Sequence, residues 1–151
     1  MNSLVYKLQL ACATVALIES CAKAPTVAQK SQERIPWAGR ALREVTTLRE
    51  LPPGVQAALG VGTPGLDGIA DRNGKYNPTD VVDSRLPMRR FLVAGLDGDS
   101  ALVAVEHGGR GWSVEVALFS NASPKATAER NWTLFEAPKT LRDLVDRLPV
   151  R

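Results

Sequence analysis

The chain contains few of the residues from which enzymes build reactive sites. It has two cysteines and one histidine, His107, in 151 residues, and aromatic residues make up only 5%. The sequence also lacks a G-x-S-x-G elbow, a phosphate-binding loop and a dinucleotide-binding glycine pattern. These gaps exclude the common hydrolase and nucleotide-binding motifs, so we expect neither a catalytic residue nor a cofactor.

The charge balance gives little support for a nucleic-acid partner. The net charge is only +3, and acidic and basic residues alternate along the chain. Nucleic-acid binding calls for a basic stripe with stacking aromatic residues. We therefore expect no nucleic acid, and the 44% hydrophobic content is that of an ordinary folded domain.

The N-terminal residues have the pattern of an export signal. Lys7 precedes an uncharged, mostly apolar run over residues 8–18, which is too short to span about 30 Å of bilayer as a helix. Residues 18–21, ending in Cys21, resemble the lipobox of a bacterial lipoprotein precursor. This resemblance implies a lipid on Cys21, whereas the rest of the chain resembles small exported bacterial proteins of unassigned role and no named family.

Two other interpretations of the N-terminus stay open. Cleavage by the ordinary signal peptidase near Ala28 would give a soluble exported protein, and the run could also be a cytosolic helix. In the leading interpretation, residues 1–20 are the signal, 21–35 a flexible tether and 36–151 a single domain. Removal of Cys12 with the signal would leave no intramolecular disulfide.

Residues 90–119 carry the strongest fold signal. Three apolar runs, 91–96, 101–105 and 112–119, are separated by glycine-rich turns, which predicts an antiparallel meander. Two-residue loops at 98–99 and 109–110 would pair Val103 with both Ala94 and Val116. One face of the sheet is then wholly apolar, and a slip of one residue would carry Glu106 and Glu115 into the core.

The remaining segments complete an α+β prediction. Apolar residues at every third position predict a helix near 38–51, and a short helix is expected over 53–59 between a proline and a glycine. Residues 131–135 predict a fourth strand, and Thr140 begins a capping box for a helix over 140–148. The expected fold is a single domain with an antiparallel meander sheet of about four strands, packed on two or three helices.

The sharpest candidate binding site lies at the end of this sheet. Arg90, His107, Arg110 and Trp112 are predicted to meet there, beside glycines whose amides could receive an anion or a partner's carboxylate. The alternative is structural: Arg90 and His107 end the core face, and Trp112 is buried.

Residues 60–87 form a long segment with many glycines and prolines, whose role the sequence leaves open. Four residues around Gly74 have calcium-loop spacing: Asp71, Asn73, Asn77 and Asp80. The first position of that loop would be Ile69, which has no side-chain oxygen. We therefore interpret the segment as a series of tight turns, with a calcium site as the weaker alternative and no metal expected.

These observations favour a non-catalytic binding or interaction module of the cell envelope, whose partner is another envelope protein. The alternatives are a small envelope hydrolase that uses His107 and a structural envelope component. A triad of Ser113, His107 and Glu106 is not expected, because the predicted register places Ser113 and Glu106 on the opposite side of the sheet from His107. Glu106 and Glu115 could form a carboxylate pair on the mixed face.

Overall fold

A computed structural model of the chain describes residues 33–98, 100–120 and 126–150. The predicted signal, Cys21 and the tether up to residue 32 lie outside these residues. The described strands are β1 (Arg34–Trp37), β2 (Arg40–Val45), β3 (Ile69–Ala70), β4 (Arg89–Asp97), β5 (Ser100–His107), β6 (Ser113–Ser120) and β7 (Thr127–Leu134). The helices are α1 (Pro53–Leu59) and α2 (Leu141–Asp146), with short 3₁₀ turns η1 (Leu48–Glu50) and η2 (Gly65–Asp67).

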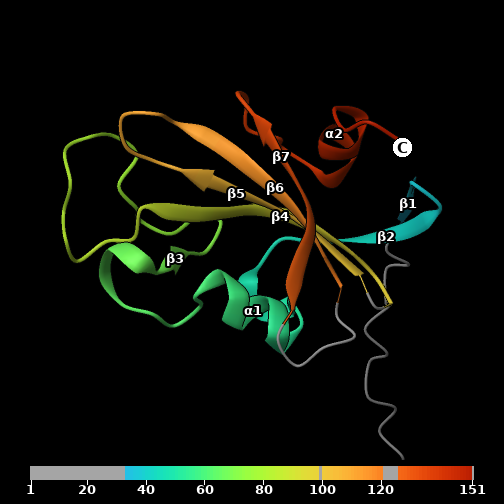
Figure 1. Cartoon of the computed structure of the whole chain (residues 1–151), viewed down its shortest axis with the longest axis horizontal. Coiled ribbons are helices and arrows are strands. Elements are labelled where there is room, and N and C mark those ends of the chain that lie inside the picture. The colour runs from blue at the N-terminus through green and yellow to red at the C-terminus, as the bar shows by residue number, and fades with distance from the viewer. Residues whose placement is uncertain (1–32, 99, 121–125, 151) are drawn as a thin grey trace, which may run out of the picture. The chain divides into compact units, whose positions relative to one another are not determined.

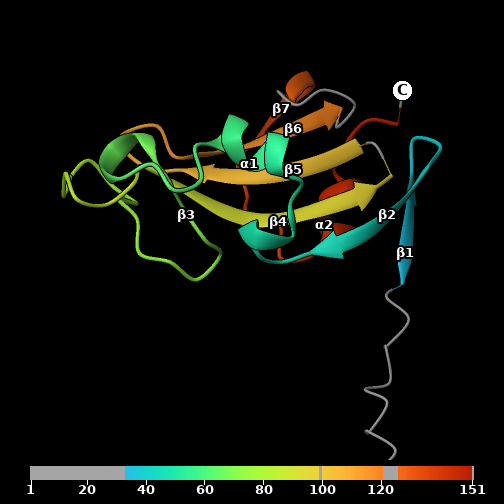
Figure 2. The same cartoon turned by 90° about the horizontal axis from the view of Figure 1, so that it is seen from below.

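Six of the strands form one antiparallel sheet in the order β1-β2-β4-β5-β6-β7. The short strand β3 pairs in parallel with the beginning of β4. Figures 1 and 2 show the long strands β4, β5 and β6 side by side at the centre, with the β1–β2 hairpin at one end and residues 60–87 at the other.

Both faces of the sheet are packed, each by a different helix. On one face α2 buries Leu141 and Leu144 against a cluster that includes Leu42, Leu102 and Val116. On the other face α1 and η1 pack over a second apolar cluster, whose members include Val45, Leu48, Val55, Leu59, Phe91, Val103 and Phe119. The central strands are therefore apolar on both sides.

The predicted α+β class with about four strands is wrong, because the domain is mainly a sheet of six to seven strands. The expected helix over 38–51 is instead the end of the β1–β2 hairpin followed by η1. Leu42 and Val45 are three residues apart, which places them on opposite faces of a strand, and each enters a different core cluster. Residues three apart also lie on one face of a helix, which explains why the sequence predicted a helix here.

The two hairpins of the meander differ in how well their registers were predicted. The first is confirmed near the turn, where Asp97 pairs with Ser100 and Ala94 with Val103. Further along, a β-bulge between Phe91 and Val93 shifts the pairing, so that Val105 pairs with Phe91 instead of with Leu92, as a two-residue loop at 98–99 would require. The second is wrong by one residue, because Val103 pairs with Ala117 and His107 with Ser113. The loop thus spans residues 108–112 instead of two residues. The slip turns Val114 and Val116 to the same face as Glu106, which is 5% exposed.

Both short helices begin as their sequences predict, and α1 also ends as predicted, whereas α2 ends at Asp146 instead of residue 148. Pro53 begins α1, and Gly60 ends it in the left-handed conformation with φ of 76°. In α2 the Oγ1 atom of Thr140 accepts a hydrogen bond of 3.2 Å from the backbone N–H of Asp143. The helix buries Leu141, Leu144 and Val145, as expected from its periodicity.

Candidate functional site

The candidate site is the end of the sheet at which β4 and β6 begin and β5 and β7 end. We call this region the sheet end. It is formed by the strand residues Arg89, His107, Ser113 and Leu134, by the loop 108–112 and by segment 60–87 (Figures 1 and 2). The predicted site residues Arg90, His107, Arg110 and Trp112 all belong to it, but the strands divide them between two faces.

Glu106 is the centre of the polar contacts on the α2 face. Its Oε2 atom accepts hydrogen bonds from Arg90, with Nε at 2.9 Å and Nη2 at 2.7 Å. Its Oε1 atom accepts a hydrogen bond of 2.7 Å from the indole N–H of Trp112. The carboxylate thus joins β4, β5 and the loop 108–112.

Tyr76 adds a contact from segment 60–87. The Arg90 guanidinium lies over its ring, 4.3 Å from the centroid. Burial raises the pKa of Tyr76 to about 12, and its hydrogen bond to Glu106 acts in the same direction. Burial alone would also raise the pKa of Glu106, but hydrogen bonds from Tyr76, Trp112 and Arg90 outweigh it and hold that pKa below its usual value. Glu106 is therefore an ionised group whose oxygens are occupied.

His107 lies on the opposite face, away from Arg90 and Trp112. Its Nε2 atom is 3.2 Å from a carboxylate oxygen of Glu115. Arg89 is its partner on β4, so the two side chains leave the sheet on the same face. Arg110 is exposed in the loop 108–112. The structure thus joins Arg90 with Trp112, separates His107 from them and places Arg110 at the surface.

The corrected register also changes the position of Ser113. It pairs directly with His107, so both side chains lie on the same face, contrary to the expected arrangement. Glu106 does lie on the other face, as expected. The described contacts include no hydrogen bond between Ser113 and His107, whose Nε2 atom faces Glu115 instead. The predicted pairing of Glu106 with Glu115 as carboxylates on one face is wrong, because adjacent strands present them on opposite faces.

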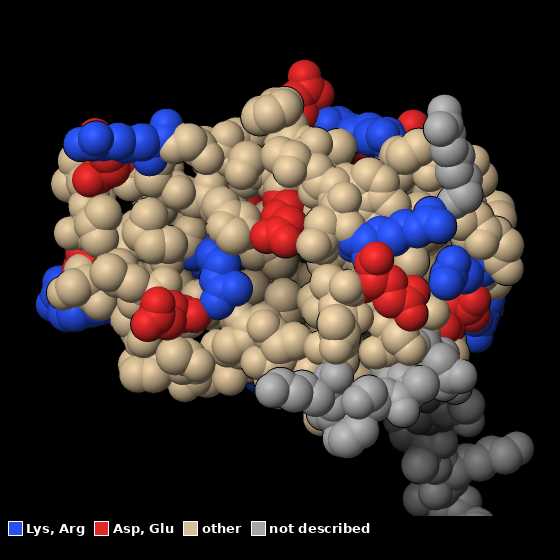
Figure 3. All heavy atoms as spheres, in the orientation of Figure 1, with Lys and Arg blue, Asp and Glu red and all other residues tan. Residues whose placement is uncertain are grey.

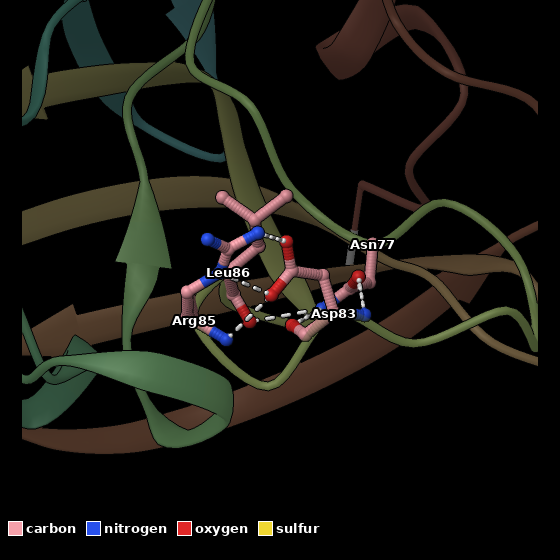
Figure 4. A network of polar contacts seen from close by, with 4 residues as sticks. All are labelled: Asn77, Asp83, Arg85 and Leu86. Atoms are coloured by element: carbon pink, nitrogen blue, oxygen red, sulfur yellow. Dashed lines mark hydrogen bonds and ion pairs between the residues drawn. The ribbon is translucent and has the colours of Figure 1, made fainter.

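Segment 60–87 is anchored through Asn77, which is 2% exposed. Its Nδ2 atom donates to the carbonyls of Asp83 and Leu86, both at 2.9 Å, and its Oδ1 atom accepts from the Asp83 N–H at 2.8 Å. Figure 4 shows these residues with Arg85, whose hydrogen bonds to Asp83 lower the pKa of that carboxyl to about 2. One buried amide thus closes the turn 77–86.

The same contacts bear on the calcium alternative. The Oδ1 atom of Asp71 accepts from the backbone N–H groups of Leu48 and Arg72, at 3.1 and 2.8 Å. The Oδ1 atom of Asn77 is also occupied, while Asn73 and Asp80 are exposed. Among the described residues no three His, Cys, Asp or Glu side chains are placed to hold a metal ion. The geometry favours tight turns over a calcium loop.

Most of the large apolar side chains that are exposed belong to the segments of the sheet end. Four of the five large hydrophobic residues that the described part of the chain exposes belong to it: Leu66 (40%), Val81 (82%), Val82 (49%) and Phe135 (77%). Segment 60–87 supplies the first three, and Phe135 directly follows β7. The fifth, Val150, lies beside Trp37 and Ala38 near the β1–β2 turn, away from this end.

Charged side chains on the visible face are mixed in sign. In Figure 3 blue and red groups are interspersed and neither forms a continuous stripe. In the described part of the chain, no helix has the length and apolar character needed to cross a membrane.

Sequence reasoning missed the roles of Glu106, Arg89 and Asn77. The signal for Glu106 was available, since this glutamate shares its face of β5 with the apolar residues Leu102 and Ala104. Asn77 gave a weaker signal, because asparagine before proline is common in turns.

The chain was compared with protein families, curated proteins and solved structures. No protein-family description, curated protein or solved structure matches the chain.

Proposed function

We propose that this chain is an exported, non-catalytic binding module of the cell envelope, and that its partner is another envelope protein. The observation that supports the binding role is the exposure of Val81 and Val82, two consecutive residues of segment 60–87 that are 82% and 49% exposed. Adjacent exposed apolar groups on a folded surface are typical of protein interaction sites. The predicted export signal in residues 1–20 supports the compartment, and a lipid on Cys21 would anchor the domain.

The anchored structure of segment 60–87 strengthens this proposal. The Tyr76–Glu106 contact holds the segment against the sheet, and Asn77 closes the turn 77–86, so Val81 and Val82 are displayed by a preorganised loop. A loop ordered before binding loses less conformational entropy when its partner arrives. The exposed Arg110 nearby would suit a carboxylate at the rim of the interface.

The test compares one double variant and one single control variant of the full-length chain with the wild type. Val81→Asp with Val82→Asp introduces charge into the proposed surface. Because both side chains are exposed, the double substitution should leave the fold intact. Val150→Asp is the matched control away from the sheet end. After cross-linking in the envelope, a partner that is captured by the wild type and V150D but lost with V81D/V82D supports the surface. Equal capture by all three proteins would refute it.

The compartment has its own test. Mass spectrometry of the mature N-terminus should find a diacylglycerol on Cys21. An unmodified N-terminus near Ala28 would indicate that the protein is exported without a lipid anchor. A mature protein that still begins with Met1 would refute export.

One observation keeps the hydrolase as a second candidate. The corrected register places Ser113 opposite His107, and Glu115 contacts the imidazole, so a nucleophile, a base and a carboxylate share one face. A short-chain ester panel tests it. Turnover by the wild type that both Ser113→Ala and His107→Ala abolish would favour the enzyme, and turnover unaffected by either would exclude this triad.

A further inference from the structure

A pocket of about 120 Å³ lies on the α1 face of the sheet, beside His107. The end of α1 and strands β5, β6 and β7 supply its apolar lining: Leu59, Val103, Val105, Ala117, Phe119 and Ala128. Glu106 lies on the other face, so this pocket is distinct from the Glu106 contacts. It is also distinct from the exposed apolar residues of the sheet end.

Three charged or titratable side chains line the same pocket: Arg89, His107 and Glu115. His107 and Glu115 contact each other at 3.2 Å. Arg89 has no carboxylate partner within the part of the chain that the structure describes. A guanidinium keeps its positive charge throughout the usual pH range. The pocket therefore combines an apolar lining with the Arg89 guanidinium, which has no described carboxylate within ion-pair distance, and with the Glu115 carboxylate, which faces His107.

Backbone contacts hold this cation in place. The Nη2 atom of Arg89 donates to the carbonyls of Leu59, at 3.0 Å, and Asp67, at 2.6 Å. Both described hydrogen bonds use this one nitrogen, so the Nη1 and Nε hydrogens remain for an anionic ligand. Both two-bond forks of a guanidinium include Nη2, so a carboxylate would accept one charge-assisted hydrogen bond here, from Nη1 or from Nε.

We propose that this pocket binds a short-chain aliphatic monocarboxylate, with its carboxylate on Arg89 and its alkyl chain over Val103, Val105 and Ala117. The volume sets the length of the chain. An apolar cavity of about 150 Å³ holds benzene, so the smaller pocket here suits about four carbons. Butyrate is therefore the probe of choice. This site goes beyond the proposed partner-binding surface, and neither depends on the other.

The experiment titrates the full-length, ¹⁵N-labelled chain with butyrate, butylamine, 1-butanol and octanoate. Butyrate should bind saturably in the millimolar range or below and shift the amide signals of Val103, Val105 and Ala117. Butylamine and 1-butanol should bind at least about tenfold more weakly, because neither can form the charge-assisted pair with Arg89. Octanoate should bind more weakly than butyrate, because its chain exceeds the pocket.

Two variants locate the site. Ala128→Leu fills the pocket while keeping all three rim groups, and Arg89→Gln removes the charge; each should weaken butyrate binding at least about tenfold. Since Arg89 also contacts two carbonyls, A128L keeps the proposal testable if R89Q does not fold. Arg49→Gln, which removes an exposed cation outside the pocket, should bind butyrate like the wild type.

Several outcomes would overturn the proposal. These are an absence of saturable butyrate binding up to about 50 mM, wild-type affinity in A128L, or equal affinity for butyrate and butylamine. Tighter binding of octanoate than of butyrate would also overturn it, since it would indicate general adsorption to apolar surface.

Discussion

The Oε1 atom of Glu106 accepts a hydrogen bond of 2.7 Å from the indole N–H of Trp112, a residue of the loop that follows the strand. The second oxygen of this carboxylate is held by Arg90 on the preceding strand. One buried charge thereby joins two strands and a loop, and Tyr76 extends the connection to segment 60–87. The contacts that define the sheet end are therefore structural, and its binding surfaces lie around them.

Replacing Glu106 should destabilise the domain strongly. Glu106→Gln removes the charge that faces Arg90 and leaves a partly buried guanidinium without its ion partner. Loss of one partner from a buried pair typically costs several kcal/mol, so we expect a loss of about 2–4 kcal/mol in the free energy of unfolding. Urea denaturation followed by tryptophan fluorescence measures it.

Glu115→Gln is the matched control for this prediction. It breaks the contact with His107, in which the two side chains are 48% and 34% exposed, respectively. An exposed pair contributes less than about 1 kcal/mol. Equal losses in the two variants would show that Glu106 is no more important than a surface carboxylate.

The stability of the wild type should decrease in acid through the same carboxylate. Because folding lowers the pKa of Glu106 from its ordinary value of 4.5, its contribution is fully present above that value and is lost as the pH falls through the lower folded pKa. The Tm difference between wild type and E106Q should therefore narrow below about pH 4.5. Thermal melts between pH 7 and 2 check this, and a constant difference over that range would contradict it.

The parts of the fold that the sequence predicted have strong local determinants. The first hairpin has an Asp-Gly turn with room for only a short loop, and Gly98 adopts a positive φ of 48° there. Helix α2 has both a capping threonine and an apolar stripe. Where local chemistry and periodicity agree, the element was predicted correctly.

The parts that it did not predict depend on distant contacts. Three glycines in the loop 108–111 permit several loop lengths, so turn chemistry could not decide the register of the second hairpin. Charged side chains usually face solvent, so the sequence favoured a register in which Glu106 and Glu115 are exposed. The observed register buries Glu106 because Arg90, Trp112 and Tyr76 supply donors from three separate segments, which a pattern along one strand cannot reveal.

Removing the amide of Asn77 should loosen segment 60–87. Asn77→Ala leaves the carbonyls of Asp83 and Leu86 and the N–H of Asp83 without their side-chain partner. Unpaired buried groups of this kind cost about 1–3 kcal/mol each at most, so we expect a loss of about 2–3 kcal/mol. Limited proteolysis should show faster cleavage within residues 77–87. Asn73→Ala, at an exposed position of the same segment, should cleave like the wild type, and identical patterns for all three proteins would refute the anchoring role.

Gly108 permits the closest approach between segment 60–87 and the sheet. A Cβ atom at this position would lie 1.7 Å from the carbonyl oxygen of Asn77, whereas one on Gly111 in the same loop would have no atom within 4 Å. Gly108→Ala must therefore displace the backbone at Asn77 and weaken the hydrogen bond from the Gly108 N–H to the Met88 carbonyl, which is 2.9 Å long. We expect a loss of about 3 kcal/mol, at the upper end for overpacking.

The comparison of the two glycines tests the packing directly. Gly111→Ala should stay within about 0.5 kcal/mol of the wild type, because it meets open space. Hydrogen exchange should locate the effect of G108A in residues 76–88 and in the end of β5, with the β1–β2 hairpin unchanged. Similar stability in G108A and G111A would mean that segment 60–87 does not pack on the loop 108–112 as described, and the preorganised display of Val81 and Val82 would lose its physical basis.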